Sequence, residues 1–225
     1  MDKIDDIINK VHCADCLEFM KNIPDKSIDL VLTDPPFNCG KDFKNDKMEL
    51  NEYFKWLDKF ISMLPRVMKD NTALLIECSK KYLPENLDIL RKYFNYEHLI
   101  INHYTNDMRR GKMGWSKYSI ILWFSKGHRK NNFCTGDLIK TVIISDKKQF
   151  RHPSPKVITC YKKIIEQFSN ENDIILDCFL GSGTTALACI QLNRKYIGIE
   201  ISPEYCKIAQ ARIDKENSQL KMELK

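Results

Sequence analysis

The sequence predicts an α/β fold with a mostly parallel sheet and helices on both faces. Ile174–Leu176 is an apolar run typical of a buried strand, a glycine-rich turn and a helix follow it, and Tyr196–Ile199 is the next apolar run. This order is that of a βαβ unit, whose two strands are parallel. A further apolar run at 28–32 stops abruptly at two prolines. With 225 residues the chain can bury a sizeable core.

Hydrophobic periodicity and helix-ending residues place the other elements. Residues 11–20 begin as a short strand and pass into a turn of helix, and residues 50–68 have apolar side chains at helical spacing. Ser202 and Pro203 begin a last helix that reaches 214, and the polar tail beyond it is expected to fray. The remaining expected elements are strands at 72–78, 98–104 and 118–124, and helices at 82–94 and 155–168.

The strand at 28–32 leads into Asp34-Pro35-Pro36-Phe37. Two prolines fix φ and donate no backbone hydrogen bond, so this stretch forms a stiff shelf with a carboxylate, backbone carbonyls and an aromatic ring. A planar base with an exocyclic amine suits these groups, because the ring can stack on the base while the carboxylate and a carbonyl accept the amine hydrogens. The alternative is an ordinary strand-ending turn, where Pro and Asp are common.

A glycine-rich turn connects the strand at 174–176 to the predicted helix Thr184–Leu192. Gly181, Gly183 and Ala186 match the nucleotide-binding fingerprint. An acid, Glu200, follows about 20 residues on, where it can accept hydrogen bonds from ribose hydroxyls. No lysine follows the turn, which argues against a phosphate-binding P-loop.

These two stretches, together with His12–Glu18 and His152–Lys156, resemble the DNA amino-methyltransferases that use S-adenosylmethionine. Asp-Pro-Pro-Phe comes first and Phe179–Thr185 comes late, which is the circularly permuted motif order of the β group of that family. The resemblance covers nearly the whole chain and implies a Rossmann-like S-adenosylmethionine-dependent methyltransferase fold in one domain, 1–225. It implies an enzyme that methylates the N6 amine of adenine in DNA at specific sites, of the kind found in restriction-modification systems.

The resemblance also assigns roles to single residues. Asp15 would lie near the adenine of the cofactor, and it also suits a helix N-cap. Ser154 and Lys156 would bind the methionine carboxylate of the cofactor, whereas the alternative for Lys156 is a surface lysine. The family usually has Thr-Gln-Lys-Pro where this chain has Ser-Pro-Lys-Val, so the backbone path can differ. The implied catalytic residues are Asp34, Pro35, Pro36 and Phe37, and the implied cofactor-binding residues are Asp15, Asp34, Ser154, Lys156, Asp177, Phe179, Gly181, Ser182, Gly183, Thr184, Thr185 and Glu200.

Positive charge is concentrated in one part of the chain. Residues 109–163 hold fourteen Lys and Arg against two acids, whereas the whole chain has a net charge of +6. Such a zone favours a polyanion partner over the alternative of a solvated face, and the resemblance implies that this partner is double-stranded DNA. The family places its target-recognition segment at 127–150; its shortness here predicts a compact recognition sequence and makes a homodimer plausible. The expected DNA-binding residues are Arg109, Arg110, Lys112, Lys126, Arg129, Lys130, Lys147 and Lys148.

The expected reaction is direct methyl transfer to the exocyclic amine of a base that has left the duplex. Hydrogen bonds from the amine to Asp34 and to the Pro35 carbonyl would free its lone pair, and Phe37 would stack on the base. No Pro-Cys dipeptide occurs, so the cysteine route to ring-carbon methylation of cytosine lacks its usual motif. The alternatives are a cytosine-N4 enzyme, whose subgroup more often begins the tetrapeptide with Ser, an RNA substrate, and a non-catalytic nucleic-acid-binding relative.

Composition and length disfavour several other classes. No apolar run of about 18 residues occurs and the acidic start is unlike a signal peptide, so we expect a cytoplasmic protein without a membrane span. The nine cysteines are most simply free thiols, and Cys13-x-x-Cys16 lacks the second pair typical of a zinc site, so no metal is expected. A nicotinamide-binding domain beginning at Asp173 would need more strands than the 25 residues after Glu200 supply, which disfavours a dehydrogenase.

Overall fold

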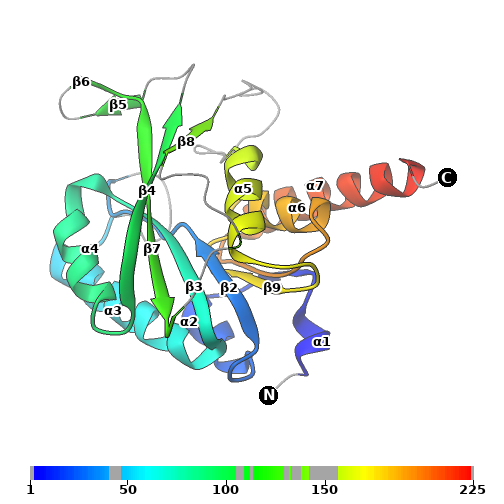
Figure 1. Cartoon of the computed structure of the whole chain (residues 1–225), viewed down its shortest axis with the longest axis horizontal. Helices are drawn as coiled ribbons and strands as arrows, with labels where there is room; N and C mark the ends of the chain where they lie inside the picture. Colours follow the sequence, from blue (N-terminus) through cyan, green and yellow to red (C-terminus); the bar gives the residue numbers. More distant parts are fainter. Residues whose placement is uncertain are drawn as a thin grey trace.

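The computed structural model describes residues 3–40, 47–104, 109–111, 114–128, 132, 138–141 and 157–223 (Figure 1). Its strands are β1 Lys10–Cys13, β2 Ile28–Thr33, β3 Met68–Cys78, β4 Asn95–Tyr104, β5 Arg109–Gly111, β6 Gly114–Ser116, β7 Tyr118–Lys126, β8 Leu138–Thr141, β9 Ile174–Asp177 and β10 Lys195–Glu200. One sheet has eight strands in the order β1-β10-β9-β2-β3-β7-β4-β8, and β5 pairs with β6 in a separate hairpin. The strands from β1 to β3 are parallel, and β7 runs antiparallel to both β3 and β4.

Helices cover both faces of the large sheet (Figure 1). They are α1 Ile4–Ile7, α2 Cys16–Phe19, α3 Leu50–Val67, α4 Leu83–Leu90, α5 Ile158–Phe168, α6 Thr184–Gln191 and α7 Pro203–Glu223, with 3-10 turns η1 Met20–Asn22 and η2 Lys80–Tyr82. One core cluster joins the sheet to α3 and α4, through side chains such as Phe60 and Ile89. A second joins it to α5, α6 and α7, through side chains such as Ile164, Ala186 and Ala209. The predicted mostly parallel α/β architecture is therefore confirmed.

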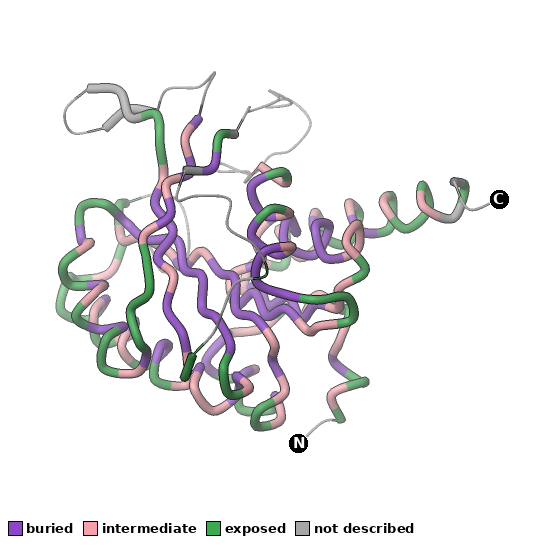
Figure 2. The backbone as a smooth tube through the Cα atoms, in the orientation of Figure 1, coloured by how far each residue is buried: buried purple, intermediate pink, exposed green. Residues whose placement is uncertain are grey.

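Strand β2 shows why the apolar run at its start is continuous. Val31 belongs to the cluster shared with α3, whereas Leu30 and Leu32 belong to the cluster shared with α5. All three side chains are fully buried, and Figure 2 shows the same burial along the neighbouring strands. A strand with a helical layer on each face must be apolar on both sides, so the alternation seen in half-exposed strands is lost.

Two helix boundaries differ from the sequence-based expectation. Helix α4 ends at Leu90, because residues 91–94 form hydrogen-bonded turns rather than a further helical turn. Helix α7 continues to Glu223, so the expectation that the tail frays after 214 was wrong for these residues. Lys, Glu, Gln and Leu dominate the extension and all have high helix propensity. Strand β8 and the hairpin β5–β6 were not predicted.

The five parallel strands end together at one edge of the sheet, which we call the carboxyl edge. The register pairs Cys13 with Glu200, Gly198 with Asp177, and Thr33 with Ile76. The ends of strands from opposite halves of the chain therefore become neighbours. Ligands bind at this edge in open α/β sheets.

Candidate active site

The shelf Asp34–Phe37 follows β2 at the carboxyl edge and is held from two sides. Tyr53 Oη on α3 donates a hydrogen bond to the Pro36 carbonyl at 3.1 Å. Asn38 has φ +52° and bonds Met48 twice, with Nδ2 donating to the carbonyl at 3.0 Å and Oδ1 accepting from the backbone N–H at 2.9 Å. These contacts add to the stiffness that the prolines impose, and they fix where the half-buried Asp34 stands.

Asp177 ties the shelf strand to the glycine-rich turn. Its Oδ1 accepts from Thr33 Oγ1 at 3.0 Å and from the Phe179 backbone N–H at 3.1 Å. Its Oδ2 accepts from Thr185 Oγ1 at 2.5 Å, while Thr33 Oγ1 also accepts from the Cys178 N–H at 3.2 Å. Burial raises the pKa of Asp177 to about 6. These contacts bind the end of β9 to β2 and to α6, so Asp177 organises the turn that was predicted to bind the cofactor.

Glu200 stands at the end of β10 beside the same turn. Its Oε2 accepts from the Gly181 backbone N–H at 2.9 Å and its Oε1 accepts from the Ser202 N–H at 2.8 Å. The residue is 8% exposed, and burial raises its pKa. Each carboxylate oxygen has two lone pairs, so these contacts leave capacity to accept the ribose hydroxyls predicted for this position.

Asp15 follows β1, whose last residue is paired in register with Glu200. Its Oδ1 accepts from the backbone N–H groups of Leu17 at 2.8 Å and Glu18 at 3.3 Å. The helix-cap interpretation of Asp15 is therefore confirmed. The cap also holds the carboxylate at the carboxyl edge, next to Glu200, where the family resemblance places the adenine of the cofactor.

The glycine-rich turn packs closely against α7. Gly183 has φ +86°, a conformation that favours glycine, and a Cβ there would stand 3.1 Å from the Ala209 Cβ. Ser182 is buried, and Arg212 Nη1 donates to its carbonyl and to its Oγ, the latter at 3.0 Å. The sequence reasoning missed Arg212, since it lies 30 residues from Ser182 and only the folded packing of α7 brings them together.

A buried polar pair that the sequence reasoning also missed lies on the other side of the shelf. Glu77 is one residue beyond Ile76, the register partner of Thr33, which places it beside Asp34. Tyr161 Oη on α5 donates to Glu77 Oε1 at 3.3 Å. Burial, followed by the charges of Glu77 and Asp34, raises the pKa of Tyr161 well above its ordinary value. The pair connects α5 to the strand that flanks the shelf.

The donor set fits a cationic nucleoside cofactor. Asp15 and Glu200 bring carboxylates to the ends of two neighbouring strands, β1 and β10, which suits hydroxyl donors, and Asp34 adds a carboxylate at the end of β2 on the far side of β9. Phe179 in the turn is half-buried and its ring packs edge-on against Phe60, with centroids 5.0 Å apart. An apolar ring beside acidic acceptors suits an adenosine with a charged sulfonium, as in S-adenosylmethionine.

The structure separates Lys126 from the shelf. Lys126 ends β7 and pairs with Thr72 near the start of β3, at the edge opposite the carboxyl edge. Its Nζ lies 3.0 Å from Asp70 Oδ1 and donates to the Met68 carbonyl at 2.8 Å. The backbone of Arg109 and Arg110 forms β5, in the hairpin that extends beyond β4 (Figure 1). The other residues predicted to bind DNA or the methionine carboxylate lie outside the described residues: Lys112, Arg129, Lys130, Lys147, Lys148, Ser154 and Lys156, as does most of the segment 127–150.

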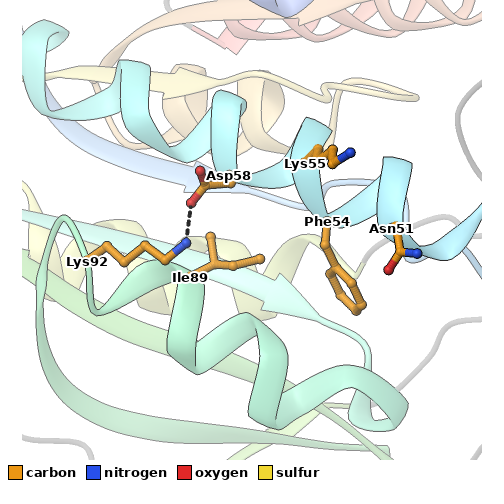
Figure 3. A pocket seen from close by; sticks show the side chains of 6 residues that line it. All are labelled: Asn51, Phe54, Lys55, Asp58, Ile89 and Lys92. Atoms are coloured by element: carbon orange, nitrogen blue, oxygen red, sulfur yellow. Dashed lines mark hydrogen bonds and ion pairs between the residues drawn. The ribbon is translucent and has the colours of Figure 1, made fainter.

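A hollow of about 410 Å³ lies between α3 and α4, and its lining includes none of the residues assigned to the site (Figure 3). Its lining residues are Asn51, Phe54, Lys55, Asp58, Ile89 and Lys92. Across the part of the chain that the structure describes, no three or more His, Cys, Asp and Glu side chains gather so as to hold a metal ion. None of the described helices is long and apolar enough to span a membrane.

Comparison with known proteins gives the same assignment as the geometry. The chain is 31% identical to the type II methyltransferase M.HpaI of Haemophilus parainfluenzae, over 91% of this chain and 74% of that one. It is 30% identical to the DNA adenine methyltransferase YhdJ of Escherichia coli (strain K12), over 89% of this chain and 81% of the relative.

Two solved structures resemble the fold closely. The M1.HpyAVI-SAM complex matches with a TM-score of 0.71 at 29% identity, over 91% of this chain and 98% of that one. The PvuII DNA methyltransferase (cytosine-N4-specific) shares the fold, with a TM-score of 0.77 at 19% identity. The match covers 92% of this chain and 89% of that one. The sequence pattern of the family described as DNA methylase matches residues 28–211. The chain therefore belongs to this N6/N4 family of S-adenosylmethionine-dependent DNA methyltransferases.

Proposed function

We propose that the protein transfers a methyl group from S-adenosylmethionine to the N6 amine of adenine in double-stranded DNA. The observation that carries the proposal is the position of Asp34, on a proline-stiffened shelf one strand away from the turn that Asp177 and Glu200 organise. A base acceptor and a cofactor site on neighbouring strands can bring the amine and the methyl group into contact. Such positioning supplies much of the rate enhancement for a reaction that needs no covalent enzyme intermediate.

Each shelf residue has a defined task in this reaction. The cofactor, when bound, supplies an electrophilic methyl group on a sulfonium. Asp34 and the Pro35 carbonyl would each accept a hydrogen bond from the amine, which localises the lone pair on nitrogen. That lone pair would form the bond to the methyl carbon as the bond from this carbon to the sulfonium breaks, and the positive charge left on nitrogen would lie next to the Asp34 carboxylate. Asp34 would take up the proton that the methylated amine releases and pass it to water, and Phe37 would hold the base by stacking.

The target base must leave the duplex to reach the half-buried Asp34. Contacts to the DNA backbone from the basic zone 109–163 would hold the duplex while the base is out of the stack. A short recognition segment at 127–150 is consistent with a compact target sequence, and a second copy of the chain would extend the contact. We expect the enzyme to act in the cytoplasm, without a bound metal.

Adenine is preferred to cytosine as the target because the tetrapeptide begins with Asp34 rather than Ser, and because the relative YhdJ is named as an adenine methyltransferase. Cytosine N4 is the second candidate, since its amine presents the same two hydrogens. The PvuII enzyme shares the fold at 19% identity, and this similarity supports the architecture without indicating which base is methylated.

Replacing Asp34 by Asn tests the catalytic role of the shelf. The asparagine side chain keeps the shape but donates as well as accepts and has no charge, so methyl transfer to unmethylated genomic DNA should fall about 100-fold or more. Cofactor affinity measured by calorimetry should stay within about threefold, because Glu200 and the glycine-rich turn are unchanged. Normal turnover in a folded Asp34→Asn enzyme would remove Asp34 from the mechanism.

A further inference from the structure

Two exposed lysines stand beside the shelf, outside the basic zone that the sequence singled out. Lys80 and Lys81 directly follow β3, whose end flanks the end of β2. The chain that leaves the shelf returns to the same place, because Cys39 Sγ lies 3.8 Å from Ser79 Oγ. The segment Asp34–Gly40 and the turn at 79–82 are therefore neighbours at the carboxyl edge.

Aromatic residues position both ammonium groups. Lys80 Nζ donates to the Tyr118 carbonyl at 3.1 Å and lies 4.0 Å from the centre of the Tyr118 ring. Lys81 Nζ donates to Tyr82 Oη at 2.5 Å and lies 4.4 Å from the centre of that ring. Tyr82 in turn packs near Tyr53, the residue that holds the Pro36 carbonyl, with ring centroids 6.3 Å apart. These aromatic, phenol and carbonyl contacts orient the two ammonium groups at the rim of the shelf.

Three lysines that form ion pairs lie elsewhere in the molecule. Lys26 and Lys126 lie 2.7 Å and 3.0 Å from carboxylate oxygens of Asp70, and Lys92 lies 2.9 Å from Asp58. In these pairs the partner carboxylate offsets the positive charge. They also lie toward the edge opposite the shelf, at the start of β2, the end of β7 and the end of α4.

DNA phosphates need cations at this position. Asp34 and the buried Glu77 bring acidic groups to the shelf, and at moderate salt the repulsion between such groups and a phosphate decays over roughly 8–10 Å. A flipped base enters the shelf while the phosphates on either side of it remain at the rim. We propose that Lys80 and Lys81 bind the phosphates that flank the target nucleotide, an inference that rests on the proposed DNA methyltransferase function.

The test uses the full chain with the double variant Lys80→Gln/Lys81→Gln. The matched control is Lys26→Gln/Lys92→Gln, which removes the same two charges from exposed ion pairs of little expected effect on stability. A second variant, Lys80→Arg/Lys81→Arg, keeps the charges. Binding of a fluorescent duplex is followed by anisotropy across a salt series, and cofactor binding by calorimetry verifies folding in each protein.

Each lost phosphate contact should reduce the steepness of the plot of log affinity against log salt by about 0.9. The slope of the double Gln variant should therefore be smaller in magnitude than that of the wild type by nearly 2. Its affinity for the duplex should fall roughly tenfold or more, equally for unrelated sequences, whereas the control and the Arg variant should stay close to the wild type. A wild-type slope in the double Gln variant would overturn the proposal, as would an equal loss in the control. If the wild type methylates no DNA, the proposed function fails; if it methylates DNA while the double Gln variant binds normally, only the lysine assignment fails.

Discussion

Asp177 shows how a buried carboxylate in this site couples folding to pH. Burial raises its pKa from 3.8 to about 6, so between these values the folded state holds a proton that the unfolded chain has released. The contribution of Asp177 to stability is therefore greatest below pH 3.8. As the pH rises to about 6, the free energy of unfolding falls by about 3 kcal/mol on account of this residue. The hydroxyl and N–H donors around Asp177 keep this shift from being larger.

Replacing Asp177 by Asn removes the titrating group while keeping an oxygen acceptor. Urea unfolding of the cofactor-free protein at pH 4.5 and 7.5 should show a smaller loss of stability with rising pH in Asp177→Asn than in the wild type. The expected reduction in that loss is about 2 kcal/mol, because the change from pH 4.5 to 7.5 crosses about two thirds of the window between the two pKa values. Equal pH dependence in the two proteins would mean that Asp177 stays ionised throughout.

Glu200 is the residue on which cofactor affinity should depend most. Replacing it by Gln removes a charged acceptor for ribose hydroxyls, and calorimetry should show the dissociation constant for S-adenosylmethionine rising about tenfold or more. Burial raises the pKa of Glu200, so this carboxylate is protonated at a higher pH than a surface glutamate is. When the solution is acidified, the affinity of the wild type for the cofactor should therefore begin to fall at a correspondingly higher pH. Glu204→Gln, an exposed change in the first turn of α7, is the control and should bind normally.

At the scale of elements, the turn between β9 and α6 depends on the close approach of α7. Gly183→Ala places a Cβ 3.1 Å from the Ala209 Cβ and 3.2 Å from its Cα, at φ +86°. Gly40→Ala is the matched control, since Gly40 has φ +76° and nothing lies within 4 Å of its added Cβ. Both variants carry the backbone penalty of roughly 1–3 kcal/mol, and Gly183→Ala should lose distinctly more stability in urea unfolding. Equal losses would show that α7 yields to the added methyl group.

The elements that the sequence predicted well are those whose own residues determine them. Strands β2 and β9 are apolar runs with Asp or Pro beside them, β10 is an apolar run that ends at Glu200, and α3 has a regular apolar face. Strand β8 is only four residues long, and each strand of the hairpin β5–β6 is three residues long. Their sequences include Arg, Lys, Gly and Ser. Their extended conformation comes from pairing with a partner strand, which no local pattern reports.

At the scale of the whole molecule, the permuted motif order predicted the central feature of the site. Strands from near the two ends of the chain, β2 and β9, lie next to each other, with Val31 paired to Leu176. The acids at their ends, and Glu200 on the next strand, were therefore predicted from the sequence. Thr33, Glu77 and Arg212 were not, because their partners are distant in sequence and the contacts depend on the packing of α5, α6 and α7 against the sheet.

Positive charge beside the shelf includes residues outside the zone 109–163. Among the side chains that the structure describes, Lys126 of that zone lies away from the shelf, whereas Lys80 and Lys81 lie beside it. Sequence position alone cannot reveal this, since β7 runs antiparallel and carries its last residue to the opposite edge. An enzyme that admits a flipped base should have its cations at the rim of the carboxyl edge.

Methylation of the N6 amine of adenine by this protein is tested by identifying the methylated nucleoside. The wild-type protein is incubated with S-adenosylmethionine carrying a labelled methyl group and with unmethylated genomic DNA, and the DNA is digested to nucleosides for mass spectrometry. Labelled N6-methyladenine is expected in the wild-type reaction, with a reduction of about 100-fold or more in Asp34→Asn. Labelled N4-methylcytosine instead, or no labelled nucleoside from a protein that binds the cofactor, would contradict this expectation.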